Sequence, residues 1–338
     1  MAARVRSIYR QLVFLTWFFT LDLIMFGAFV RLTDSGLGCP DWPGCYGKLT
    51  PFGASGQIAE ALTQQPYGPV SMSKAWIEMI HRYWGSVLGM LIIAIVVMAW
   101  RYRKQIGRPA GLATFCLVAV CLQGAFGAWT VTHKLMPVIV TAHLLGGMLL
   151  LALMSWLAAR EKAHAPIPAG MVVYRPWMWF GLLILFVQIV FGGWVSTNYA
   201  ALACMDFPTC HGQWIPEMDF VGGYSVFRGL GELSSGEMIS QQALTAIHWV
   251  HRNFAIFVFV FLFAIALRLR KEQGLRAPAQ WLVLLLLMQV LTGLSTIFFQ
   301  WPLLIAVLHN GGAAGLVIAA VTILVRLSRA GTDYKVLP

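Results

Sequence analysis

Eight long apolar runs constrain this chain more than any other feature of its sequence. A helix of about 20 apolar residues is long enough to cross the hydrocarbon core of a bilayer. Charged residues make up only 11% of the 338 residues, against roughly 25% in soluble domains. The runs lie at about 12–30, 75–100, 110–131, 137–158, 177–197, 240–268, 279–298 and 303–326. The sequence therefore predicts an all-α membrane protein with eight transmembrane helices.

The distribution of basic residues predicts the orientation of these helices. Short translocated loops are poor in Lys and Arg, and most of the 24 basic residues fall on one side, as at 101–104 and 268–271. Both termini are therefore expected in the cytoplasm. The net charge of +11 follows from this topology and from anionic lipid, so no nucleic-acid binding is inferred. An N-terminus without transit-peptide features favours a bacterial inner membrane.

A Cys-x5-Cys loop occurs twice, as GLGCPDWPGCYGKLTP from Gly36 and as ALACMDFPTCHGQWIP from Ala201. With the termini inside, both loops lie on the outer face, where disulfides form. We expect the local bridges Cys39–Cys45 and Cys204–Cys210; free thiols or a metal site are the alternatives. Cys116 and Cys121, inside the third apolar run, are expected to be packing residues.

The repetition extends from the loops into the apolar runs. Gly27 and Gly192 are 165 positions apart, like the cysteine pairs, and His143 and His309 are 166 apart. The chain therefore divides into four-helix halves at 1–160 and 161–338. Because four is an even number, both halves enter from the same side as parallel repeats, related by a pseudo-two-fold axis along the membrane normal.

Histidines are the clearest polar residues inside the apolar runs. Ionisable groups in the bilayer are functional candidates, and His81, His143, His251 and His309 lie at matched depths in the second, fourth, sixth and eighth helices. Two imidazoles from neighbouring helices in each half suit haem iron. Hydrogen bonding to a neighbouring helix is the alternative for any single histidine. A zinc site needs a third or fourth ligand, which only His248 obviously offers.

Several motifs together resemble haem A synthase over nearly the whole chain. They are GxxxRLTxSGLGCPDWPxCxG from Gly27, the Glu-x-x-His-Arg of Glu78 to Arg82, AHLLGG, IHWVHR and LHNGGAA. The resemblance implies an eight-helix protein that converts the C8 methyl group of haem O into the formyl group of haem A for terminal oxidases. The route it implies is successive hydroxylation followed by loss of water from a geminal diol.

The same resemblance assigns roles to the histidine pairs. It implies that His251 and His309 ligate the iron of a haem b that relays electrons, and that His81 and His143 face the substrate haem. Expected partners are a haem O synthase and an electron donor or acceptor such as a quinone. The resemblance is also compatible with a homo-oligomer.

The resemblance also marks Glu78 as the catalytic glutamate. Glu78 shares a helix face with His81, and a carboxyl in an apolar pocket suits proton transfer. The alternative is that it only pairs with Arg82 or with a loop. His248 occupies the repeat position of Glu78 and is expected beside the ligand. Arg82 and Arg252 are candidates for contacts with haem propionates.

Two other function classes fit part of the pattern. A di-haem membrane cytochrome working with quinol would need the same four histidines, but not Glu78 in one half only. A haem carrier would also use parallel repeats, but usually with broken helices near the midplane. The segments 52–74 and 217–239 are expected to form short helices over the pockets.

Overall fold

The computed structural model describes residues 2–107, 109–233 and 235–331, and these form helices and loops without a β-strand. Positions 332–338, which end the expected half 161–338, lie outside the described residues. Among the described residues, eight helices are long and apolar enough to cross a membrane, as the sequence predicts. They are α1 (Ala2–Leu32), α3 (Met72–Arg101), α5 (Gly111–Thr132), α6 (Pro137–Arg160), α7 (Tyr174–Thr197), α9 (Gln241–Leu269), α10 (Gln273–Phe298) and α11 (Leu303–Leu327).

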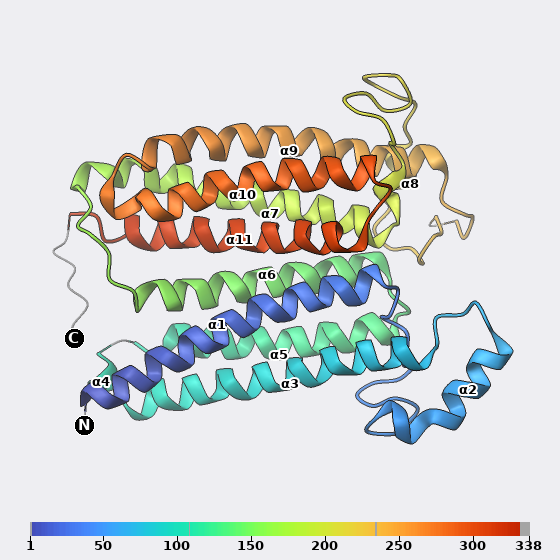
Figure 1. Ribbon diagram of the computed structural model, residues 1–338, viewed down its shortest axis with the longest axis horizontal. Helices are drawn as coiled ribbons and strands as arrows, with labels where there is room; N and C mark the ends of the chain where they lie inside the picture. The colour runs from blue at the N-terminus through green and yellow to red at the C-terminus, as the bar shows by residue number, and fades with distance from the viewer. Residues whose placement is uncertain (1, 108, 234, 332–338) are drawn as a thin grey trace.

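Six short elements connect these helices. They are η1 (Pro51–Ala54), α2 (Ser55–Gln64), α4 (Arg103–Ile106), η2 (Ala169–Val173), η3 (Ala200–Leu202) and α8 (Phe220–Gly223). Short helices therefore do form in both long connecting segments. Figure 1 shows α2 projecting beyond the end of α3, away from the helix bundle.

Helix α10 begins at Gln273, before the apolar run at 279–298. It therefore contains Pro278 in its second turn. Proline has no N–H to donate, so the carbonyl of Gly274, four residues earlier, loses its helical partner. Arg326 of α11 donates to that carbonyl at 2.7 Å. A side chain from the next helix thus replaces the missing backbone hydrogen bond.

The helices form two groups of four that follow the order of the chain (Figure 1). Helices α1, α3, α5 and α6 lie together, and α7, α9, α10 and α11 lie together. The groups meet where α11 contacts α1 and α6, and where α7 contacts α6. The first turn of α1 and the last turn of α11 lie at one end of the bundle, and the two cysteine loops lie at the opposite end, which we call the loop end.

Four residues at the loop end join the two groups. Arg31, near the end of α1, pairs with Asp34 at 3.1 Å and donates to the carbonyl of Ser196, near the end of α7. Its guanidinium lies 4.2 Å from the ring centre of Tyr199, whose hydroxyl donates to Asp34 at 2.7 Å. Arg31 and Ser196 are 165 positions apart, as are Asp34 and Tyr199, so this contact joins matching positions of the two halves.

Candidate functional site

Both cysteine loops are closed by local disulfides. Cys39 is bonded to Cys45 and Cys204 to Cys210, each pair with its Cα atoms 4.9 Å apart. The predicted pairing is confirmed. Cys116 is buried as expected, whereas Cys121 is exposed on the surface of α5 and does not pack inside the protein.

An aspartate shapes the turn inside each loop. Asp41 accepts hydrogen bonds from the backbone N–H groups of Tyr46 and Gly47, and Asp206 accepts from those of His211 and Gly212. The Thr209 hydroxyl, followed by the two backbone N–H groups, lowers the pKa of Asp206 to about 2. The carboxylate of Asp206 is therefore charged above about pH 2, and its loop contacts persist until the pH falls through that value.

Removing the second disulfide by Cys204→Ser with Cys210→Ser is expected to reduce the free energy of unfolding by about 2–3 kcal/mol at most, because the closed loop is short. Denaturant unfolding in detergent measures this change. Cys121→Ser, outside the loops, is the matched control and should have little effect. A loss above about 5 kcal/mol would contradict a purely local clamp.

Each loop is anchored to the helix that follows it by the N–H of its first cysteine. Cys39 donates to the Oε2 atom of Glu78 on α3 at 2.8 Å, and Cys204 donates to the Nδ1 atom of His248 on α9 at 3.2 Å. Both acceptor residues are buried, each 5% exposed. Glu78 and His248 therefore make the same structural contact with different chemical groups.

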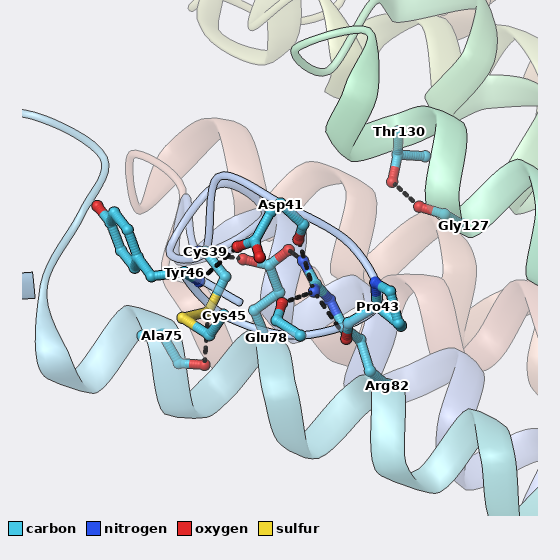
Figure 2. A network of polar contacts seen from close by, with 11 residues as sticks. Cys39, Asp41, Pro43, Cys45, Tyr46, Ala75, Glu78, Arg82, Gly127 and Thr130 are labelled. Carbon is cyan, nitrogen blue, oxygen red and sulfur yellow. Dashed lines mark hydrogen bonds and ion pairs between the residues drawn. A yellow bond between two sulfur atoms is a disulfide. The ribbon is translucent and has the colours of Figure 1, made fainter. Parts of the chain in front are cut away.

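The two arginines beside these acceptors hold the loops as well, and Figure 2 shows the contacts of the first of them, Arg82. Arg82 donates to the carbonyl of Asp41 at 2.8 Å and to that of Gly44 at 2.6 Å, and it pairs with the Oε1 atom of Glu78. Arg252 donates to the carbonyls of Asp206 at 2.9 Å and Thr209 at 3.2 Å. The sequence did not indicate these carbonyl contacts, and the contacts of the two arginines with haem propionates stay a prediction. The contacts named as the alternative role of Glu78, with Arg82 and with a loop, are both present in the structure.

One cavity of about 1260 Å³ is lined by residues of both halves. Pockets for small ligands usually measure about 300–1,000 Å³, so this cavity suits a large ligand or more than one. Each of the four matched histidines lies about two to three turns from the loop end of its helix. The cavity brings together His81 of α3, His143 of α6, His251 of α9 and His309 of α11.

Residues of the cysteine loops line the cavity at the loop end. Trp42, Pro43, Gly44 and Leu49 come from the first loop, and Phe207 comes from the second. Among the described residues that line the cavity, none belongs to 52–74 or 217–239. The expectation that these two segments cover the pockets is therefore wrong, because the shorter loops before them already reach the cavity.

Each of the four histidine rings faces a glycine on a neighbouring helix. A Cβ atom added at that glycine would lie 2.9–3.4 Å from the ring. The pairs are Gly27 with His81, Gly127 with His143, Gly192 with His251, and Gly293 with His309. Glycine at these positions leaves room beside each imidazole that any other side chain would fill, and the four sites repeat at the spacings seen in the sequence.

Glutamines on neighbouring helices orient three of these histidines. The side-chain amide of Gln123 donates to the carbonyl of His143 at 2.9 Å, and that of Gln289 donates to the carbonyl of His309 at 3.0 Å. The amide nitrogen of Gln188 lies 3.0 Å from Nδ1 of His251 and donates to its carbonyl at 3.1 Å. Gln123 and Gln289 are 166 positions apart, as are His143 and His309.

The ligand set fits a haem better than a zinc ion. Within the part of the chain that the structure describes, no three His, Cys, Asp or Glu side chains are grouped to hold a metal ion. Each half instead offers two imidazoles, an apolar cavity and the space left by the glycines. Two imidazoles on neighbouring helices of an apolar cavity would suit a haem iron, for which histidine is a common ligand.

The fold and the site define a multi-pass membrane protein with paired histidines in an apolar cavity under disulfide-closed loops. The family model described as cytochrome oxidase assembly protein matches residues 10–321. The haem A synthase of Shewanella oneidensis is 40% identical over 311 residues, which is 91% of this chain and 93% of that protein. The haem A synthase of Sphingopyxis alaskensis is 30% identical, over 90% of this chain and 87% of that protein.

The haem A synthase of Nitrosomonas eutropha is 28% identical, with 90% of both chains covered. The family model covers both cysteine loops and at least part of each of the eight long helices. The chain therefore belongs to the haem A synthase family, as its motifs indicate.

Proposed function

We propose that this protein oxidises the C8 methyl group of haem O to the formyl group of haem A by successive hydroxylations, at a site near the outer face of the membrane. The observation that supports this most is an asymmetry between the two halves. Each half lines the cavity with a histidine pair, and the carboxylates among the described lining residues, Glu78 and Asp34, both belong to the N-terminal half. Glu78 shares a helix with His81, whereas His248 takes the matching place beside His251.

The orientation rests on two features that agree. The disulfides lie at the loop end, and disulfides persist on the oxidising side of a membrane. Basic residues such as Arg101, Arg268 and Arg326 lie at the ends of helices on the opposite side, as cytoplasmic residues do. We therefore place both termini in the cytoplasm of a bacterium and the histidine pairs in the outer half of the inner membrane.

The two histidine pairs take different haems in this proposal. His251 and His309 would ligate the iron of haem b, and His81 and His143 would face the substrate haem O. When bound, haem b would supply a one-electron redox centre. The shared cavity supports this arrangement, because residues of both pairs line it.

Glu78 is the residue that we assign to proton handling. Oxidation of a methyl group moves protons together with electrons, and a side chain that gives and takes a proton near the substrate assists it. His248 anchors the second loop without a carboxylate, so loop anchoring alone does not account for the acid at Glu78. Its Oε1 atom, paired with Arg82, and its Oε2 atom are the sites where the proton would reside.

The partners follow from the chemistry of the substrate. Haem O is poorly soluble in water, so a membrane-bound haem O synthase is the expected supplier. The electrons require a membrane partner such as a quinone. We also propose that the two four-helix halves, 1–160 and 161–338, are parallel repeats, supported by the matched loop, glycine and glutamine contacts.

Production of haem A in living cells tests the proposed reaction. A bacterial strain that makes haem O but has no haem A synthase of its own would be given the gene for this chain. Extracted pigments should then contain haem A, whereas the strain with an empty vector should accumulate haem O. Haem O without any haem A or hydroxylated product, despite stable protein in the membrane, would refute the proposal.

A further inference from the structure

His143 and His309 occupy matching positions and have nearly identical surroundings. Each carbonyl accepts a hydrogen bond from a glutamine amide, Gln123 or Gln289, at about the same distance. Each ring has its Cε1 atom 3.4 Å from a Cβ added at the facing glycine, Gly127 or Gly293. The backbone and the ring edge are therefore held alike in the two halves.

The two rings differ at Nδ1. In the C-terminal half, Nδ1 of His309 lies 2.9 Å from the hydroxyl oxygen of Thr292. In the N-terminal half, Nδ1 of His143 is buried and has no hydrogen-bond partner among the described residues. The position 166 residues before Thr292 is Phe126, which has no polar atom and packs edge-on against Trp129.

The direction of the Thr292 contact follows from its other hydrogen bond. The hydroxyl donates to the carbonyl of Met288 at 2.8 Å, as threonine does inside helices, so its oxygen is left to accept from His309. Because the hydroxyl oxygen of Thr292 accepts this hydrogen bond, the ring proton of His309 lies on Nδ1. The lone pair of Nε2 is then free to bind a metal. Partners of this kind fix the tautomer of a ligand histidine and raise its basicity.

Gln188 does not replace this contact at the other C-terminal ligand. The atom that faces Nδ1 of His251 is the amide nitrogen, which donates to the carbonyl of the same residue. An amide nitrogen does not accept a proton from Nδ1. Thr292 is therefore the side chain that supplies an acceptor to a ring nitrogen in the C-terminal pair.

We propose that Thr292 is a positioning residue that makes His309 a permanent haem ligand, and that Phe126 leaves His143 a weaker ligand for a haem that must enter and leave. The inference rests on the proposed function, in which one pair holds a resident haem b and the other receives haem O and releases haem A. One hydroxyl, present beside His309 and absent beside His143, distinguishes these two matched ligands.

Thr292→Val tests this inference, because valine has the same shape but no acceptor. The purified protein is mixed with excess apomyoglobin, and the rate at which haem b leaves is followed by absorption. Loss of such a partner typically costs 10–100-fold in metal affinity, so haem b should leave about 10–100-fold faster. The midpoint potential of haem b should become more positive, because a less basic imidazole stabilises ferric iron less. Thr292→Ser should restore both values.

Phe126→Thr is the matched change in the other half. It places a hydroxyl beside His143 and should slow the loss of haem from the N-terminal site to apomyoglobin. A wild-type rate would contradict the role assigned to Phe126.

His309→Ala separates failure of this inference from failure of the proposed function. If His309→Ala removes haem b while Thr292→Val keeps the wild-type loss rate and potential, the role of Thr292 is wrong and the haem assignment stands. If His309→Ala retains normal haem b, both are wrong.

Discussion

Glu78→Gln is expected to lower haem A formation by about 10²–10⁴-fold, the range typical of a lost acid–base group. Glutamine keeps the size of the side chain and can still accept the hydrogen bond from the N–H of Cys39, but it cannot exchange a proton. The fold and the haem b content should therefore stay nearly unchanged. Pigment analysis of cells that make haem O measures the effect, and the C8 alcohol is the intermediate to look for.

Glu60→Gln is the matched control for this substitution. Glu60 lies on α2, is exposed, and is absent from the residues that line the cavity. Haem A formation should be normal in that variant. If Glu78→Gln also makes haem A at the normal rate, the role of Glu78 reduces to the contacts already seen with Arg82 and Cys39.

His251→Ala and His309→Ala are each expected to remove the retained haem b together with its low-spin absorption. One imidazole cannot replace a bis-histidine site, so either change alone should suffice. Absorption spectra and extracted pigment of the purified variants measure the loss. His133→Ala, at an exposed histidine just after α5, is the control. Normal haem b in both ligand variants would exclude these residues as its ligands.

The parts of the fold set by hydrophobicity and chain length follow from the sequence. All eight spans lie within a few residues of the apolar runs, except that α1 begins at Ala2 and α10 begins before Pro278. Both differences have local causes. The residues before the first apolar run continue the helix, and Arg326 satisfies the carbonyl that Pro278 leaves free. The cysteine pairs were predictable because a short loop brings their Cα atoms close together.

The contacts made between the helices and the loops were not predictable in the same way. The partners of Arg82 are carbonyl groups of a loop about 40 residues away, and only the folded loop points these groups at the guanidinium. The repeat shows which positions match, but not what each one touches. The informative signal in the sequence was the difference between the matched residues Glu78 and His248. The difference between Phe126 and Thr292 became informative only through the contact of Thr292 with His309.

The pigment content of the purified wild-type protein tests the central claim most directly. The claim is that one histidine pair holds a resident haem b and the other receives the substrate haem. Protein purified from cells that make haem O should yield haem b together with haem A or a hydroxylated derivative of haem O. Haem b alone, at two per chain, would contradict the claim and would instead indicate a di-haem electron-transfer cytochrome.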